Sequence, residues 1–235
     1  MSFLSKSNLE LARQRPFRAW QVLLELTNGQ YYRIKFRLLG RRVIIGKRFR
    51  VRGRLDIRGP GTVIFGDDCT VLSTRIAPTT PCTQSRQAVI RFGNHVALNG
   101  ARLSCKQLIN VGDNAMIAGA RISDSDFHDI EVKGGYRINS TGITKPIVIG
   151  ANAWICAGAM VLKGVRIGDS AVVSAGAVVA GRVPPNGVVF GNPARLVWRV
   201  NASKPDPAAV TVPVAKEEAR VQKAGTVGPS SSHNV

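Results

Sequence analysis

Three histidines are the side chains best suited to acid–base chemistry, because an imidazole pKa lies close to neutral pH. They are His95, His128 and His233. His128 closes the run Asp124-Ser-Asp-Phe-His128, so a carboxylate from this run could orient its ring for proton transfer. The sequence makes His128 the candidate general base and Asp126 the candidate orienting carboxylate. A surface histidine without a catalytic role is the alternative.

A fold with a six-residue period must position these residues, because that period dominates the second half of the sequence. Aliphatic residues recur every six positions from Ile149 to Val179, and small or β-branched residues do so from Ala153 to Val183. The period fits neither a helix nor a simple strand. Six residues make one short strand and one corner, so three units close a coil and successive coils stack into a solenoid.

The same phase extends toward the N-terminus, with interruptions. It includes residues from Ile45 to Ile117, with Ala77 among the expected inward positions. The register breaks near residues 78–88 and between residues 123 and 146. We expect both breaks to protrude as loops, and protruding loops are where solenoids commonly carry function.

The repeats resemble those of the hexapeptide-repeat acyltransferases across roughly residues 43–200. The segments that carry the resemblance are Ile149-Gly-Ala-Asn-Ala-Trp-Ile155, Val165-Arg-Ile-Gly-Asp169, Ser174-Ala-Gly-Ala-Val-Val179 and Gly191-Asn-Pro-Ala-Arg195. The run that ends at His128, before a long loop, is similar to the branch of polysaccharide, lipopolysaccharide and galactoside O-acetyltransferases. The resemblance implies an all-β fold, a left-handed parallel β-helix, and a homotrimer whose sites lie between adjacent subunits.

The resemblance also implies roles for individual residues. His128 occupies the place of the family's catalytic histidine. Asn99 matches an asparagine that holds the acceptor, and a structural asparagine at a corner is the alternative. Trp154 matches a tryptophan that lies along the pantetheine arm of coenzyme A, with plain packing as the alternative.

Further positions match the remainder of the coenzyme site. Ala157 and Ala175 match residues whose backbone groups bond to the pantetheine amides, and Arg195 matches a basic residue near the nucleotide phosphates. The sequence departs from the family at two points. Gly181-Arg182 replaces a Lys-Asp pair, so we expect Arg182 to supply the missing cation. Cys156 replaces a glycine and is expected to be a small filler.

The two ends of the chain differ from the solenoid. Residues 8–27 show a loose helical pattern interrupted at Pro16, which predicts a short helix that caps the first coil in preference to entering a membrane. After Asn201 the periodicity stops and a disordered tail is expected. The predicted divisions are therefore a capping segment at 1–42, the β-helix domain at 43–200 and a tail at 201–235.

Basic residues gather near the N-terminus of a chain whose formal net charge is +19. Up to Arg58 there are 15 Lys and Arg against three acidic residues, a net of +12. Between Tyr31 and Arg58 they alternate with apolar residues, which on strands would point the basic side chains outward. A solvated face, an anionic membrane and a phosphate-bearing glycan carrier remain open, while nucleic acid is disfavoured because no stacking aromatics are interleaved.

These observations predict an O-acetyltransferase that moves acetyl from acetyl-CoA to a sugar hydroxyl of a glycan or of a nucleotide- or lipid-linked sugar. An N-acetyltransferase for an amino sugar and a non-enzymatic glycan- or membrane-binding solenoid are the alternatives. A zinc carbonic anhydrase on the same solenoid needs three histidines, and only two lie in the repeats, so no metal is expected. Four cysteines without C-x-x-C spacing and no signal-peptide core predict a cytoplasmic protein, with peripheral contact at the inner membrane face left open.

Overall fold

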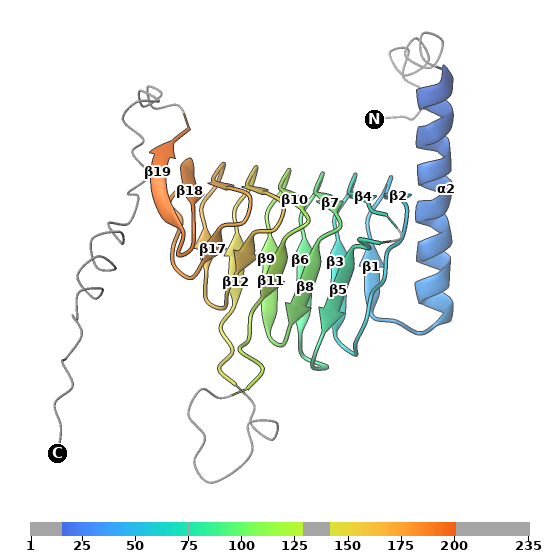
Figure 1. Cartoon of the computed structure of the whole chain (residues 1–235). Helices are drawn as coiled ribbons and strands as arrows, with labels where there is room; N and C mark the ends of the chain where they lie inside the picture. The colour runs from blue at the N-terminus through green and yellow to red at the C-terminus, as the bar shows by residue number, and fades with distance from the viewer. Residues whose placement is uncertain (1–15, 75, 129–141, 201–235) are drawn as a thin grey trace, which may run out of the picture. The chain divides into compact units, whose positions relative to one another are not determined.

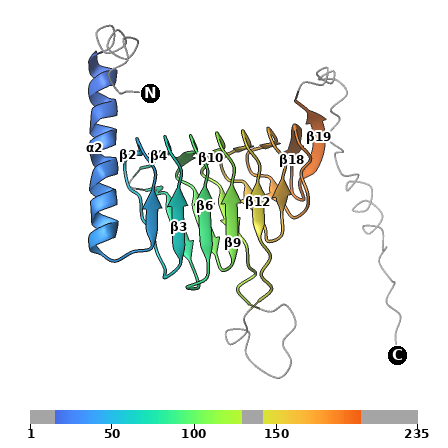
Figure 2. The same cartoon turned by 180° about the vertical axis from the view of Figure 1, so that it is seen from behind.

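The computed structural model describes residues 16–74, 76–128 and 142–200 as one helix followed by a solenoid of parallel strands (Figure 1). The helix is α2 (Pro16–Leu38). After it, the chain passes in turn through three sheets that form the walls of the solenoid (Figure 2). Every strand pair between coils is parallel, and the closing strand β19 is antiparallel to β18.

The strands of each sheet follow one another along the solenoid. The first sheet contains β1 (Val43–Ile45), β3 (Thr62–Phe65), β6 (Val89–Phe92), β9 (Leu108–Val111), β12 (Ile147–Ile149) and β15 (Arg166–Ile167). The second contains β2 (Arg50–Arg52), β4 (Thr70–Leu72), β7 (Ala97–Asn99), β10 (Met116–Ala118), β13 (Trp154–Ile155), β16 (Val172–Val173), β18 (Gly187–Phe190) and β19 (Arg195–Arg199). The third contains β5 (Thr80–Thr83), β8 (Arg102–Cys105), β11 (Arg121–Ser123), β14 (Met160–Val161) and β17 (Val178–Val179).

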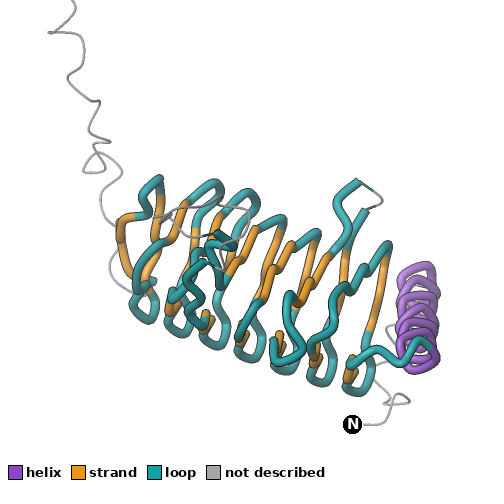
Figure 3. The backbone as a smooth tube through the Cα atoms, turned by 90° about the horizontal axis from the view of Figure 1, so that it is seen from below, coloured by secondary structure: helices purple, strands orange, loops and turns teal. Residues whose placement is uncertain are grey.

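Three corners join these sheets, and we number them in chain order. The first corner leads from the first sheet to the second, the second corner leads from the second sheet to the third, and the third corner leads back to the first sheet. Figure 3 shows the coils stacked along the solenoid, with the helix at one end. Residues at the same corner of successive coils therefore lie next to one another, whereas residues at different corners are separated by a sheet.

Both predicted ladders point inward. All members from Ile149 to Val179 and from Ala153 to Val183 are at most 3% exposed. Because one coil cannot bury its own inner face, each aliphatic residue packs against its equivalents in the neighbouring coils. The six-residue period is thereby confirmed as the repeat of the core.

The first predicted loop is partly wrong. Residues 80–83 form β5 inside the third sheet, while Ala77 is exposed and does not point inward. Thr79 and Thr83 fill the inward positions, and their hydroxyls bond to backbone groups of neighbouring coils. The Thr79 hydroxyl accepts the N–H of Gly100 at 3.1 Å, and the Thr83 hydroxyl accepts the N–H of Gly61 at 2.8 Å. The six-residue pattern of aliphatic residues does not reveal this part of the repeat, because threonines whose hydroxyls are hydrogen-bonded take the inward positions.

The helix is longer than the sequence pattern suggested. Pro16 begins it, a position where the missing N–H costs nothing, and the helix continues to Leu38. Residues 31–38 are therefore helical, and only the later part of the basic stretch alternates along strands. Tyr32 and Phe36 are buried against the first coil, and the Tyr32 hydroxyl accepts the N–H of Leu55 at 3.1 Å. The helix covers the end of the core, as a capping element must.

Aromatic packing is concentrated in the first coils. Phe65 and Phe92 occupy equivalent positions on β3 and β6, and Phe49 lies at the first corner, just before β2. The ring centroids of Phe49 and Phe65 are 4.9 Å apart, as are those of Phe65 and Phe92. Later coils use isoleucine, valine and alanine at their inward positions. The largest inward side chains therefore lie toward the end that the helix covers.

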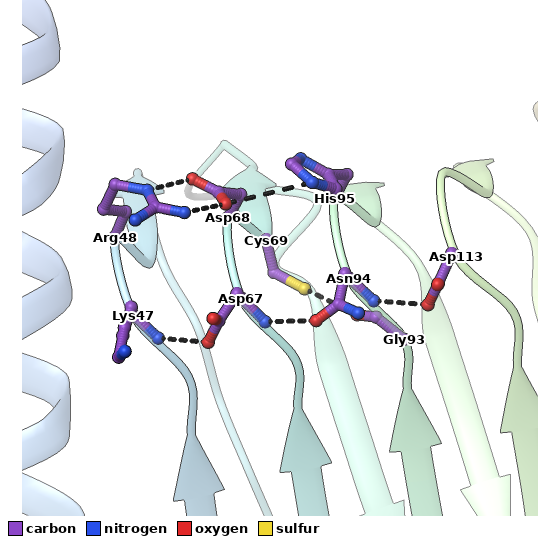
Figure 4. A network of polar contacts seen from close by, with 9 residues as sticks. All are labelled: Lys47, Arg48, Asp67, Asp68, Cys69, Gly93, Asn94, His95 and Asp113. Carbon is purple, nitrogen blue, oxygen red and sulfur yellow. Dashed lines mark hydrogen bonds and ion pairs between the residues drawn. The ribbon is translucent and has the colours of Figure 1, made fainter. Parts of the chain in front are cut away.

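The first corner carries a ladder of side-chain bonds, which Figure 4 shows. The N–H of Lys47 donates to Oδ1 of Asp67 at 2.7 Å, that of Asp67 to Oδ1 of Asn94 at 2.9 Å, and that of Asn94 to Oδ1 of Asp113 at 2.7 Å. The next residue at each of these turns has a positive φ: Arg48, Asp68, His95 and Asn114, and further along Asn152, Ser170 and Asn186. Arg48 pairs with Asp68, and its guanidinium holds the pKa of that carboxyl below the usual value.

No helix among the described residues is long and apolar enough to cross a bilayer. The strands begin at Val43 and β19 ends at Arg199. The proposed divisions at residues 42 and 200 stay predictions, and the predicted tail lies outside the described residues.

Candidate active site

Three of the predicted residues form a single column at the second corner. The N–H of Gly119 donates to the carbonyl of Asn99 at 2.6 Å, and the N–H of Gly176 donates to the carbonyl of Ala157 at 3.0 Å. Ala175 precedes Gly176 in the coil after that of Ala157. Asn99, Ala157 and Ala175 are all exposed, so this column presents backbone and small side chains to solvent.

Trp154 lies near this column, on β13 of the second sheet. Its backbone is in register with Met116 on one side and Val172 on the other, and its side chain is 45% exposed. An indole that is half in solvent leaves one face available to a ligand. The structure thus places Trp154 on the outer face of the second sheet, three residues before Ala157, rather than in the core.

His128 lies at the third corner, at the neck of the long loop. The two arms of the loop pair there: the N–H of Asp126 donates to the carbonyl of Ile143 at 3.1 Å, and the N–H of Lys145 donates to that of Asp124 at 2.9 Å. An isolated bridge between Ser125 and Thr144 adds to this neck. The side chain of His128 is exposed, at the last described position before the loop.

The two carboxylates before His128 have different environments. Asp124 is fully buried and accepts backbone N–H groups from Lys106, Gln107 and Leu108 at 2.7, 2.7 and 2.9 Å. Its oxygens are therefore committed to holding the corner. Asp126 accepts a bond from Lys163 Nζ to its Oδ1 at 2.6 Å, while its Oδ2 is buried without a hydrogen-bond partner in the described structure. Asp126 thus remains the candidate orienting carboxylate.

A groove of about 640 Å³ runs along the outer face of the third sheet, which separates the second corner from the third. Its lining residues come from several coils and from the neck of the loop: Arg58, Pro78, Thr80, Cys82, Arg102, Leu103, Ser104, Arg121, Ile122, Ser123, Phe127, Met160, Val161 and Leu162. Arg102 and Arg121 are direct neighbours in register. The described lining contains three arginines and no carboxylate, so the groove favours anionic groups.

The remaining predicted residues are spread more widely. Arg182 is exposed at the third corner, one coil beyond Lys163, and Arg195 is exposed on β19. Within one chain the structure therefore does not bring Arg182 together with Ala157 and Ala175. Among the residues that the structure describes, no group of three or more His, Cys, Asp or Glu side chains is arranged to hold a metal ion.

The buried thiols are poor nucleophiles. Burial raises the pKa of Cys69 to about 11 and also raises that of Cys156. Burial and the neighbouring carboxylate of Asp124 raise the pKa of Cys105. Because the thiolate is the reactive form, these cysteines are largely unreactive at neutral pH. The role of Cys156 as a small filler stays a prediction.

Sequence reasoning did not single out Lys163, Arg102 or Arg121. Lys163 stands at the third corner of the coil that follows the loop, and Asp126 stands at the same corner of the preceding coil. Assigning each position of the six-residue pattern to a corner would therefore have placed the two side chains near each other. Arg102 and Arg121 lie on strands that pair in the interrupted part of the repeat. They are 19 residues apart, one more than three six-residue units, so the ladder alone does not place them side by side.

Comparison with known proteins supports the architecture. Residues 146–181 match the model of a family described as bacterial transferase hexapeptide, six repeats. A structure of AntD, an N-acyltransferase from Bacillus cereus, superimposes with a TM-score of 0.51 at 17% sequence identity, covering 70% of this chain and 88% of that one. The fold class of this chain is therefore the hexapeptide-repeat solenoid, a left-handed parallel β-helix.

Two curated relatives are galactoside O-acetyltransferases. The one from Escherichia coli strain K12 is 34% identical over 93 residues, which is 40% of this chain and 45% of that protein. The one from Lactococcus lactis is 35% identical over 95 residues, again 40% and 45%. The chain thus spans less than half the length of these two relatives. On its repeats and fold, this chain resembles the hexapeptide-repeat transferases over the part that these comparisons cover.

Proposed function

We propose that this protein is an acetyl-CoA-dependent O-acetyltransferase that modifies a sugar hydroxyl of a glycan or of a nucleotide- or lipid-linked sugar. One observation carries the proposal: Asp126 and His128 stand at one corner of the solenoid and the exposed Asn99, Ala157 and Ala175 at another, so that two copies of the chain can bring the two sets together. The names of the two curated relatives support both the donor chemistry and an acceptor hydroxyl.

The reaction is a direct transfer in a ternary complex. His128 takes the proton of the acceptor hydroxyl, whose oxygen attacks the thioester carbonyl. The new C–O bond forms, the C–S bond breaks, and the proton on His128 passes to the departing thiolate of coenzyme A. Backbone N–H groups stabilise the oxyanion of the tetrahedral intermediate. Asp126, held by Lys163, orients the imidazole.

The donor lies along Trp154, Ala157 and Ala175. The pantetheine amides bond to backbone groups at Ala157 and Ala175, and the acceptor is held by Asn99. Arg182 and Arg195 are the cations for the nucleotide phosphates. Because Arg182 stands at a different corner from Ala157, one chain does not supply the whole set. A homotrimer resolves this by placing the third corner of one subunit against the second corner of the next.

The test is release of free thiol from acetyl-CoA in the presence of a panel of sugars, with mass detection of the added acetyl group. His128→Ala should lower the rate by at least about 100-fold, because general-base catalysis typically contributes that much. His95→Asn is the matched control, since His95 is also exposed but stands at the first corner. Asparagine tolerates the positive φ at that position.

Two results would contradict the proposal. Equal rates for the wild type and His128→Ala would remove His128 from the chemistry. Acetylation of amino sugars alone, with no transfer to any hydroxyl, would make the protein an N-acetyltransferase on the same scaffold.

A further inference from the structure

The helix α2 has two apolar faces, and only one of them is covered. Tyr32 and Phe36 are buried against the first coil, while a second row of residues is exposed along the helix. That row follows alternating steps of three and four, the spacing that keeps side chains on one side of a helix. Its members are Phe17, Trp20, Leu24, Thr27, Tyr31, Ile34 and Leu38, which we call the outer row.

The outer row is strongly exposed for such large side chains. Phe17 is 83% exposed, Trp20 60%, Ile34 58% and Leu38 81%. Near the end of the helix, Tyr31, Ile34 and Leu38 of the row, together with Lys35 and Leu39, line a depression of about 350 Å³. A contiguous apolar surface of this kind marks an interaction site in a soluble protein.

The charge around the outer row has one sign. Residues 16–42 contain six basic side chains and a single acidic one, Glu25. Arg33, Arg41 and Arg42 donate to the carbonyls of Gly46, Gly59 and Arg86 in the solenoid, and the other three basic side chains are Arg18, Lys35 and Arg37. Glu25 is buried on the other side of the helix, where it lies 3.7 Å from Arg52 of β2. In this described stretch the outer row is therefore flanked by positive charge without an exposed carboxylate.

This charge distinguishes between two occupants. A second copy of the chain would bring Lys35, Arg37 and their neighbours against identical cations, with no acidic partner to offset the repulsion. An anionic bilayer offers apolar depth for the row and negative headgroups for its flanks. Trp20 and Tyr31 are also residues that favour the interfacial zone of a membrane.

We propose that α2 docks this protein on the surface of an anionic lipid bilayer, with the outer row in the interface and the side chains of Lys35 and Arg37 at the headgroups. The helix lies across the end of the solenoid, so docking leaves the three sheets and their corners free (Figure 1). His128 follows β11, which stands three coils beyond the first coil, about 14 Å along the solenoid at ordinary strand spacing.

The test is co-sedimentation of the whole protein with vesicles of pure phosphatidylcholine and with equimolar phosphatidylcholine and phosphatidylglycerol. The wild type should bind only the anionic vesicles, and high salt should weaken that binding. Trp20→Ser with Ile34→Ser should lower the partition coefficient at least tenfold. Arg37→Gln should lower it about fivefold, the usual effect of one basic residue at an anionic surface.

Phe190→Ser is the matched control, because Phe190 is 55% exposed on β18, far from the helix in the order of the second sheet. It should bind vesicles as the wild type does. Far-UV circular dichroism and the thermal midpoint establish that the variants are folded. Acetyl transfer to a soluble sugar should be unchanged in the helix variants, so this proposal and the proposed function can fail separately.

Three outcomes would overturn the proposal. The first is absence of binding to anionic vesicles by the wild type. The second is equal binding by the wild type and the double variant. The third is a drop in solution mass caused by the double variant, which would identify a second copy of the chain as the occupant.

Discussion

Two aspartates that stand two residues apart have separate tasks at the neck of the long loop. Asp124 is buried under three backbone N–H groups, whereas Asp126 is held through one oxygen by Lys163. A carboxylate that satisfies three buried donors fixes the backbone around it. Asp124 is thus a structural support for the segment that carries His128, and Asp126 is the candidate partner of the reaction.

Asp124→Ala should lower the free energy of unfolding by at least about 2 kcal/mol, since three backbone donors lose their acceptor and an unsatisfied buried donor is costly. Thermal and urea unfolding measure the change. Asp67→Ala is the comparison, because its carboxylate accepts a single exposed N–H, from Lys47. A loss for Asp124→Ala no larger than that for Asp67→Ala would contradict this structural role.

At the scale of elements, the contact between α2 and the first coil depends on a residue without a side chain. A Cβ atom built on Gly29 would lie 1.9 Å from the carbonyl oxygen of Phe49, much closer than real Cβ contacts. The Asn28 side chain also donates to the carbonyl of Val51 at 3.3 Å. The helix therefore touches the strand next to it by backbone, and it cannot shift without losing these contacts.

Gly29→Ala should loosen the cap, although alanine favours a helix, because overpacking of this kind costs about 1–3 kcal/mol. We expect a lower thermal midpoint and faster proteolysis after basic residues of α2. Gln30→Ala serves as the control, since Gln30 is exposed in the same turn. If Gly29→Ala were as stable as Gln30→Ala, the close approach to Phe49 would not hold the helix.

The elements also show how much of the fold the sequence allows one to predict. The ladder from Ile149 to Val183 predicts the coils directly, because every inward position is aliphatic or alanine. It fails at Thr79 and Thr83, where buried hydroxyls satisfy the backbone, and it does not give the length of α2. The candidate site residues were named from the family pattern, but their division between two corners depends on how many residues each coil uses.

At the scale of the whole molecule, the solenoid changes along its length. The first coils have strands of three or four residues, and their core contains phenylalanine rings in contact with one another. Strands β13 to β17 have two residues each, and the core there is built mainly of valine, isoleucine and alanine. In a stack each coil contacts only its neighbours, so local stability follows local burial. The two halves of the solenoid should therefore differ in their resistance to opening.

Hydrogen exchange followed by mass spectrometry should show this difference. Amides of β6 and β9 should exchange slowest, and those of β15 to β17 should exchange faster, by at least about tenfold for a difference of 1.4 kcal/mol in opening free energy. Amides of the exposed residues of α2 serve as the reference for fast exchange. Uniform protection across all coils would mean that the solenoid opens only as a whole.

The side-chain ladder at the first corner has a direction. In each bond described there, the acceptor belongs to the coil that follows the donor's coil, from Lys47 to Asp67, then to Asn94 and to Asp113. Each of these side chains thus accepts a backbone N–H of the preceding coil rather than one of its own coil. Removing one of these acceptor side chains will leave a backbone N–H without its acceptor in the preceding coil, one coil nearer the N-terminus. Gain or loss of a coil at the C-terminal end of the solenoid would therefore leave the corner bond of the first coil intact.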